Sequence, residues 1–337
     1  MQDSDFTYNL KILVVGYGSI GKRHISNLTK IGKIKIIVHT KRKKDNFLKK
    51  NNCSVFSKLE NCLNENPTAA IICNETSLHV KIATKLIKNN IHVFIEKPLS
   101  NSLIGIKQLK KMVRAKRIIT HIGCVQRFHP ITKKTKEIIE KKSIGKIKFL
   151  HAKNSSYLPD WHPDEDYKES YAARPELGGG VVLTCIHELD YLIWLFGKIN
   201  KVIAINKNIG NLGIDVNDFS TSFLEFSNKS IGKLHLDFFQ IPKSRFCKIV
   251  SEKGMLHLDF EKNQLRFYDI KSKKWKNIIK IKGFNKNCMY LDEMKYFLKC
   301  IKNNKTSFND INFGEGVLKT ALLIEKSSRK KKELLNK

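Results

Sequence analysis

The sequence contains no uninterrupted apolar run of about eighteen residues, so it offers no segment that would cross a membrane as a single helix. Its first residues, MQDSDFTYNLKILVVG, carry acids where a secretory signal needs positive charge. The eight cysteines are scattered, with no Cys-x-x-Cys pair and no metal-ligand spacing. We therefore expect a cytoplasmic protein with reduced thiols, no membrane span, no secretory signal and no bound metal.

Arginine is scarce, although the chain is strongly basic. Only nine of the 63 basic residues are arginine, so lysine spread along the chain causes most of the formal net charge of +32. Specific contacts with nucleic-acid bases rely heavily on arginine, and no RNP-type or zinc-finger pattern is present. A nucleic-acid-binding module is therefore the least favoured interpretation, and the charge is better suited to attracting anionic small molecules.

The length of 337 residues and a change in pattern indicate two domains. Residues 1–125 alternate apolar strand-like runs with amphipathic helical stretches, which is typical of a parallel sheet covered on both faces. Residues 126–337 contain runs with period-two alternation, which indicate a mostly antiparallel sheet with one covered face. The predicted fold is therefore α/β, with an N-terminal Rossmann-type doubly wound parallel sheet and a C-terminal α+β domain with a large, mostly antiparallel sheet.

A glycine-rich turn, GYGSIG, follows the first strand-like run and begins a helical stretch, as a dinucleotide-binding turn must. Gly16 allows the tight turn, Gly18 allows the backbone to approach a pyrophosphate, and Gly21 allows the helix to pack closely on the strand. The first helical turn, with Ser19 and Ile20, then offers N–H groups to the phosphates. An ordinary glycine turn is the alternative.

The second strand-like run ends without an acid that would hold a ribose 2′-hydroxyl about twenty residues after the glycines. Thr40, Lys41 and Arg42 stand there instead. A hydroxyl followed by an arginine favours a 2′-phosphate, so NADP is favoured over NAD as the cofactor. Arg42 is the more informative residue, because lysine is common everywhere in this chain.

The segment IHVFIEKPLS places Glu96, Lys97 and Pro98 at the carboxyl end of a strand-like run, where an open α/β sheet binds ligands. Together with GYGSIG, QRFHP and GGGVVLTCIHELDYLIWLFG, it resembles the glucose–fructose oxidoreductase/inositol dehydrogenase (Gfo/Idh/MocA) family over essentially the whole chain. The stretch WHPDEDYKESYAARPELGGG resembles the branch found with surface-polysaccharide and sialic-acid-like sugar biosynthesis.

The resemblance implies an N-terminal Rossmann domain, a C-terminal sheet used to form a homodimer or homotetramer, and NAD(P)-dependent oxidation or reduction of a sugar or polyol carbon. Lys97 takes the place of the motif lysine, which binds cofactor and substrate and assists proton transfer. His187 takes the place of the motif histidine. Asn74 and Glu96 are further cofactor-binding candidates.

The GGG stretch departs from the family pattern, since many members have an aspartate where this chain has Thr184. We expect one helix here, on which Thr184 and His187 share a face. His187 is the predicted acid–base group, with Lys97 polarising or shuttling at the same oxygen. Asp190 is predicted to orient His187 or to bind substrate, and Thr184 to hydrogen-bond a substrate hydroxyl. A structural histidine is the alternative.

The remaining substrate-binding candidates are Arg127 and three residues of the loop before this helix, Trp161, His162 and Arg174. A tryptophan face can pack against a sugar ring, and an arginine can hold a carboxylate or phosphate. Packing of the loop is the alternative for each of them. His79, on a predicted amphipathic helix, is expected to cap or pack rather than to bind a ligand.

The favoured function is hydride transfer between NAD(P) and a carbon of a sugar, sugar nucleotide or related polyol. One alternative is a glycosidase that uses tightly held NAD for transient oxidation, and it predicts a cofactor that co-purifies. A second is a non-catalytic dinucleotide-binding protein, for which Thr184 is the hint. That alternative predicts cofactor binding without turnover.

Overall fold

The computed structural model describes residues 10–336 and divides into two compact units. The first comprises the described residues up to 125 together with 286–315, and the second comprises 126–285 together with 316–336. The sequence predicts that everything after residue 125 lies in the second domain, but residues 286–315 belong to the first unit. The reason is apolar packing, because Met294 and Phe297 share one buried core with Ile25 and Leu28.

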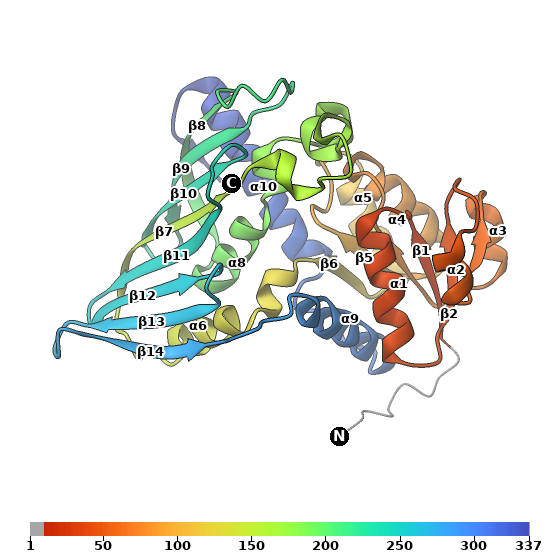
Figure 1. The fold of residues 1–337 in the computed structure, drawn as a ribbon, viewed down its shortest axis with the longest axis horizontal. Coiled ribbons are helices and arrows are strands. Elements are labelled where there is room, and N and C mark those ends of the chain that lie inside the picture. The colour runs from red at the N-terminus through yellow and green to blue at the C-terminus, as the bar shows by residue number, and fades with distance from the viewer. Residues whose placement is uncertain (1–9, 337) are drawn as a thin grey trace. The chain divides into compact units, whose positions relative to one another are not determined.

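A parallel sheet forms the centre of the first unit (Figure 1). It has six strands in the order β3-β2-β1-β4-β5-β6. Every residue of β4 and β6 is buried, which explains why the strands read as continuous apolar runs. The order reverses between β1 and β4, where such sheets bind ligands. The strands are β1 (Lys11–Val15), β2 (Lys35–His39), β3 (Ser54–Phe56), β4 (Ala69–Ile72), β5 (His92–Glu96) and β6 (Thr120–Gly123).

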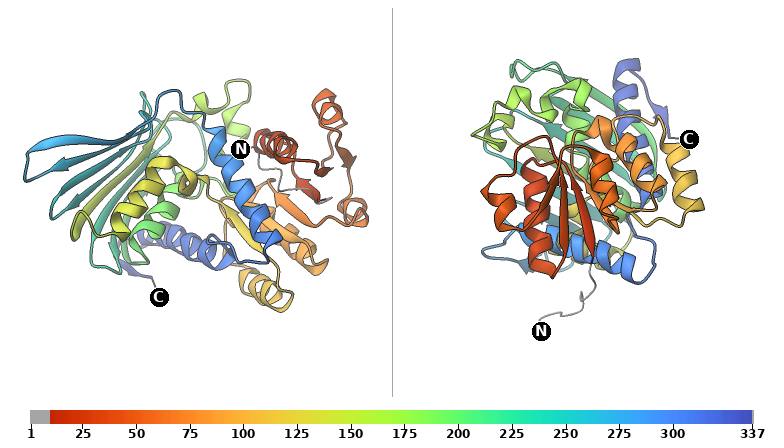
Figure 2. Two further views of the ribbon diagram at one scale, coloured as in Figure 1. Left: turned by 90° about the horizontal axis from the view of Figure 1, so that it is seen from below. Right: turned by 90° about the vertical axis from the view of Figure 1, so that its right-hand side faces the viewer.

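Helices lie on both faces of this sheet (Figure 2), so the predicted doubly wound fold is confirmed. Among the helices that enclose it, α9 comes from late in the chain and packs against α1. They are α1 (Ser19–Ile31), α2 (Asn46–Lys50), α3 (Leu59–Asn64), η1 (Thr76–Leu78), α4 (His79–Lys88), α5 (Ile106–Ala115) and α9 (Asn287–Lys302).

The second unit contains a nine-stranded sheet in the order β14-β13-β12-β11-β7-β10-β9-β8-β15. All neighbours are antiparallel except β7 and β10, so the mostly antiparallel sheet is also confirmed. Buried residues alternate with partly exposed ones along most strands. The strands are β7 (Ile147–Ser155), β8 (Ile199–Lys207), β9 (Phe219–Phe226), β10 (Ile231–Asp237), β11 (Ser244–Ser251), β12 (Gly254–Asp259), β13 (Gln264–Asp269), β14 (Lys274–Lys280) and β15 (Leu334–Leu335).

Among the described residues, helices cover one face of this second sheet and no helix covers the other (Figure 1). They are α6 (Pro130–Glu140), α7 (Val181–Thr184), α8 (His187–Phe196) and α10 (Ile311–Lys330), which begins in the first unit. Single 3-10 turns make up much of the remaining chain: η2 (Val125–Phe128), η3 (Leu158–Trp161), η4 (Tyr167–Glu169), η5 (Tyr171–Ala173) and η6 (Pro175–Leu177).

Within residues 10–336, no single helix is both long and apolar enough to span a membrane. A bent pair of segments, 175–184 and 187–196, passes the same criterion by length and composition. Most of α8, the second of these segments, is buried in the second unit, as a core helix is.

Candidate active site

The glycine turn after β1 has the backbone geometry that a dinucleotide-binding loop requires. Gly16 has a φ of +104°, and a Cβ there would lie 2.7 Å from the carbonyl oxygen of Cys73. At Gly21 a Cβ would collide with the carbonyl oxygen of Gly16. Gly18 faces open space and caps α1 without a side chain, so the first N–H groups of the helix, beside Ser19 and Ile20, stay available. This turn therefore fits a pyrophosphate.

The substitution Gly18→Ala should weaken cofactor binding strongly and change the stability of the fold only slightly. No heavy atom lies within 4 Å of a Cβ at this position, so the free energy of unfolding should fall by about 1 kcal/mol at most, the difference between glycine and alanine as a helix N-cap. Affinity for NADPH, measured by fluorescence titration, should fall more than tenfold, or about 1.4 kcal/mol. Gly316→Ala, which also faces open space, is the control. Unchanged NADPH affinity would show that no ligand approaches Gly18.

The loop after β2 presents Thr40, Lys41 and Arg42, and within residues 10–336 neither of these cations forms an ion pair with an acid. Lys41 and Arg42 are exposed, and the Arg42 backbone N–H donates to Thr40 Oγ1 over 3.1 Å. The first acid after the strand, Asp45, caps α2 and accepts a hydrogen bond from the hydroxyl of Tyr17, which lies 2.8 Å from each carboxylate oxygen. Burial, together with this bond, raises the pKa of Tyr17, so the phenol stays protonated. Asp45 is therefore engaged by Tyr17, and the exposed Lys41 and Arg42 are available to contact a cofactor.

His79 joins the two loops that follow β4 and β5. Its Nδ1 lies 2.9 Å from the carbonyl oxygen of Pro98 and its Nε2 lies 3.0 Å from that of Asn74. Burial lowers the pKa of His79, while the two carbonyls, Glu96 and Glu75 oppose that shift. This histidine thus holds two loops of the first unit together, a role close to the expected packing.

Asn74 carries a buried amide oxygen that has no hydrogen-bond partner among the described residues. Buried acceptors in folded proteins almost always have a partner, and such an exception requires an explanation. A ligand that donates a hydrogen bond would satisfy it. The atom lies just beyond the carboxyl end of β4, beside the switch in strand order, which supports Asn74 as a cofactor-binding residue.

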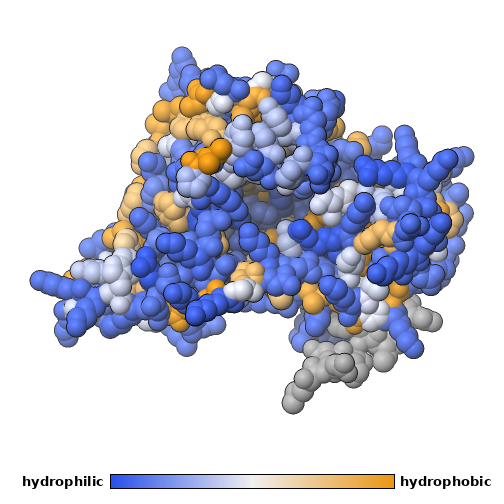
Figure 3. Space-filling view, viewed as in Figure 1, coloured by the Kyte–Doolittle hydropathy of each residue, from blue (hydrophilic) through white to orange (hydrophobic). Residues whose placement is uncertain are grey.

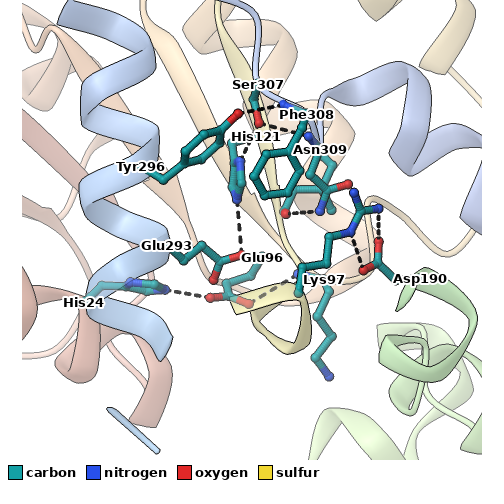
Figure 4. A network of polar contacts seen from close by, with 12 residues as sticks. His24, Glu96, Lys97, His121, Asp190, Glu293, Tyr296, Ser307, Phe308 and Asn309 are labelled. Carbon is teal, nitrogen blue, oxygen red and sulfur yellow. Dashed lines mark hydrogen bonds and ion pairs between the residues drawn. The ribbon is translucent and has the colours of Figure 1, made fainter. Parts of the chain in front are cut away.

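Glu96 and Lys97 are held by a buried histidine that sequence analysis missed. The Nε2 atom of His24, which is fully buried on α1, lies 2.6 Å from Glu96 Oε1 (Figure 4). The other carboxylate oxygen of Glu96 accepts the backbone N–H of Lys97 over 3.3 Å. The pair therefore fixes the backbone where Lys97 leaves the sheet. The position of His24, three residues after Gly21, was the available signal.

A second buried pair lies in the same unit, between β6 and α9. His121 Nε2 lies 3.2 Å from Glu293 Oε1, and its Nδ1 lies 2.7 Å from the hydroxyl of Ser307 (Figure 4). Both His121 and Glu293 are at most 1 % exposed. The sequence offered no indication of this pair, because its members are 172 residues apart. No group of three or more metal-ligand side chains occurs in residues 10–336.

The GGG stretch does not form the single helix that we predict from sequence. Helix α7 ends at Thr184 and α8 begins at His187, with a bend of 48° between segments 175–184 and 187–196. The β-branched and cysteine residues around the break are weak helix formers, which explains why it lies there. Thr184 and His187 consequently do not share a helical face, whereas His187 remains one turn before Tyr191.

Asp190 and Arg127 bind each other inside the second unit. The guanidinium of Arg127 donates from Nε and Nη2 to the two carboxylate oxygens of Asp190 over 2.8 and 2.7 Å. Both side chains are at most 1 % exposed. Each side chain is engaged by the other, which weighs against the predictions that Asp190 orients His187 or binds substrate and that Arg127 binds substrate. The physical reason is that a buried charge requires a paired partner.

Glu188 forms a neighbouring network that the sequence analysis did not find. Its carboxylate is fully buried and accepts from Arg245 Nε over 2.7 Å and from Asn154 Nδ2 over 3.1 Å. Helix α8 therefore buries three titratable side chains, and the two acids among them each have an arginine. This arrangement favours a rigid helix whose His187 is held at its first turn.

The loop before α7 leaves its three candidates in different settings. Trp161 is partly buried, donates from Nε1 to Ser156 Oγ over 2.9 Å and packs edge-on against Phe238. Arg174 pairs with Glu169 and Glu176 at distances of 2.8 and 2.6 Å. His162 is exposed. The packing of Trp161 and the ion pairs of Arg174 explain how each side chain is held within this loop. Both residues remain candidates for substrate contact.

Comparison with known proteins agrees with this geometry. Two family models match: "Oxidoreductase family, NAD-binding Rossmann fold" (GFO_IDH_MocA) over residues 10–124, and "GFO/IDH/MocA C-terminal domain" over residues 132–257. Myo-inositol 2-dehydrogenase of Thermotoga maritima is 28% identical over 235 residues, which are 66% of this chain and 67% of that protein. A solved levoglucosan dehydrogenase in complex with NADH has the same fold, with a TM-score of 0.88 and 17% identity over 98% of this chain and 100% of that one.

A third relative is 2,7-anhydro-N-acetylneuraminate hydratase of Escherichia coli, which is 26% identical over 212 residues. The match covers 61% of this chain, and the chain spans about half of that protein, 54% of its length.

Proposed function

We propose that this chain, which belongs to the GFO/IDH/MocA family of oxidoreductases, transfers a hydride between NAD(P) and a carbon of a sugar, sugar nucleotide or related polyol. The observation that carries the proposal is the turn at Gly16, Gly18 and Gly21, which leaves the start of α1 open, beside the unpartnered amide oxygen of Asn74. The dehydrogenases among its relatives support the substrate class.

Lys97 and His187 handle the proton in this proposal. A bound nicotinamide would supply or accept the hydride, and the substrate oxygen then needs a proton donor or a base. The His24–Glu96 pair fixes the backbone of Lys97, and α8 presents His187 at its first residue. Trp161, His162, Arg174 and Thr184 are proposed to contact substrate, whereas Asp190 and Arg127 stabilise α8 from within.

NADPH should bind more tightly than NADH, because exposed Lys41 and Arg42 follow β2 and would attract a 2′-phosphate, whereas Asp45 is already engaged by Tyr17. Hydrogen bonds to a charged group contribute about 1.5–3 kcal/mol, so Arg42→Ala should weaken NADPH binding by roughly 10–150-fold and leave NADH unchanged. Both affinities can be titrated by tryptophan and nicotinamide fluorescence. Lys49→Ala, an exposed cation on α2, is the control.

If Arg42→Ala weakens the binding of NADPH and NADH equally, Arg42 contacts a part of the dinucleotide that both cofactors share. NADH preference in the wild type would keep the oxidoreductase proposal and overturn the use of Arg42. If neither cofactor binds and the denatured protein releases none, the proposed function is wrong.

A second candidate is a glycosidase-type reaction in which tightly held NAD is reduced and reoxidised within one turnover. The hydratase relative supports it, because addition of water to a substrate involves no net oxidation or reduction. This candidate predicts a nicotinamide that co-purifies in about equal molar amount. It also predicts conversion of an anhydro sugar or glycoside with constant absorbance of reduced nicotinamide. Stoichiometric NAD(P)H production would exclude it.

The uncovered face of the second sheet is proposed to join copies of the chain into a homodimer or homotetramer. Ile203 and Phe223 lie opposite each other on β8 and β9, with Ile205 beside them, and each is 46–59 % exposed. Hydrophobic residues gather in this part of the second unit (Figure 3). Phe223→Lys should shift the protein to monomer in analytical ultracentrifugation, while Trp275→Lys, on β14 at the far edge, should shift it less. A monomeric wild type would contradict the proposal.

A further inference from the structure

We propose that the first unit carries a second anion site, for a small molecule with at least two phosphate groups. A cavity of about 860 Å³ lies between α5 and the segment 304–315, within the size range of small-molecule sites. Its lining includes Ile118, Ile119 and Thr120, at the amino end of β6. The glycine turn follows the carboxyl end of β1, so in this parallel sheet the two sites occupy opposite edges.

The α5 wall of the cavity is a row of cations. Lys107, Lys110, Lys111 and Arg114 lie along α5, where Lys107 and Arg114 are each three or four residues from both Lys110 and Lys111, and Arg117 comes just after the helix. Like charges at these spacings destabilise a helix. This row therefore lowers the stability of the helix unless an anion lies against it.

The two acids in the cavity neutralise only one cation of the row. Asp310 accepts backbone N–H bonds from Asn312 and Phe313 and so caps the start of α10. Glu315 pairs with Lys110. Among residues 10–336, the other four cations have no acidic partner.

The placement of arginine distinguishes this cavity from the general excess of lysine. Only nine arginines occur in the chain, and most have an acidic or aromatic partner. Arg114 and Arg117 have neither in the described part of the chain. The partnered arginines are Arg23 over Tyr290, Arg127 with Asp190, Arg174 with Glu169 and Glu176, Arg245 with Glu188, Arg266 over Trp275, and Arg329 near Glu325.

The remaining lining indicates what else the ligand carries. Asn304, Thr306 and Asn312 offer neutral hydrogen-bonding groups, and the start of α10 adds the positive end of its dipole. Ile118, Ile119 and Ile311 form an apolar floor. Two guanidinium groups suit two phosphates, each held through paired hydrogen bonds, and the floor suits an organic group attached to them.

Inorganic tripolyphosphate is the probe, titrated calorimetrically into the full chain with saturating NADPH present. We expect binding to persist, and Arg114→Gln with Arg117→Gln to weaken it at least tenfold. The control, Lys141→Gln with Lys142→Gln, removes the same charge from exposed positions elsewhere and should weaken binding less than twofold. Loss of binding when NADPH is added would place the anion in the cofactor loop and overturn the proposal. An equal loss in the control would also overturn it, since it would show diffuse attraction.

Two further measurements separate a built site from misfolding. Without anion, the double glutamine variant should unfold at the same temperature as the wild type or higher, because repulsion along α5 is relieved. The double variant Arg114→Lys with Arg117→Lys retains the positive charge but removes the planar guanidinium groups. It should weaken tripolyphosphate binding severalfold. Unchanged affinity in this variant would contradict a phosphate-shaped site. The arginine variants remain informative even if NADPH does not bind, so this test is independent of the proposed function.

Discussion

Asp190→Ala should lower the free energy of unfolding by about 3–5 kcal/mol, because it leaves the guanidinium of Arg127 buried and unpaired. Asp190 binds that guanidinium through two hydrogen bonds of 2.7 and 2.8 Å. Urea unfolding followed by circular dichroism measures the change. Glu169→Ala is the matched control, since it removes one partner of the partly exposed Arg174 and should cost less than about 1 kcal/mol.

The double variant Arg127→Met with Asp190→Leu tests whether the stability lost in Asp190→Ala comes from the unpaired charge or from the missing side-chain volume. Replacing a buried ion pair by apolar residues of similar size is often neutral, so most of the lost stability should return. If Asp190→Ala instead unfolds like the wild type and only turnover is lost, Asp190 acts in the chemistry, as the sequence alone predicts.

Lys97→Met should lower kcat/KM by roughly 10²–10⁴-fold, the range typical of a group that moves a proton in the transition state. Methionine preserves much of the side-chain length and removes the ammonium. The loss should lie mainly in kcat, because NADPH is also held by the glycine turn and by the loop at Arg42. Steady-state kinetics with a sugar substrate and a separate NADPH titration measure the two effects.

The control for Lys97 is Lys88→Met, which removes an exposed lysine at the end of α4 and should leave the kinetics unchanged. His187→Asn is expected to lower kcat/KM over the same range. Wild-type turnover in Lys97→Met would remove this lysine from the proton transfer, and a loss confined to NADPH affinity would restrict it to cofactor binding.

The features that the sequence predicts correctly are those set by neighbouring residues. The strand before Gly16 and the helix after Gly21 follow from local pattern, since a continuous apolar run and a glycine turn each carry their own signal. The alternation along β8 and β9 likewise indicates the second sheet.

The features that the sequence does not predict depend on distant partners. Arg127 meets Asp190 across 63 residues, and His24 meets Glu96 across 72. No local pattern indicates that these side chains neutralise each other, so Asp190 looked like a catalytic acid. The break after Thr184 is a different case. The sequence has weak helix formers there, but the apolar pattern continues across them and so predicts one uninterrupted helix.

The return of residues 286–315 to the first unit has a consequence for folding during synthesis. Phe94 on β5 packs edge-on against Phe297 on α9, with ring centroids 5.6 Å apart. Residues 126–285 must leave the ribosome between them, which takes on the order of 10–30 s at 5–20 residues per second. Throughout that interval the sheet face that α9 covers stays exposed on the nascent chain. That apolar face is where aggregation of the growing polypeptide would begin.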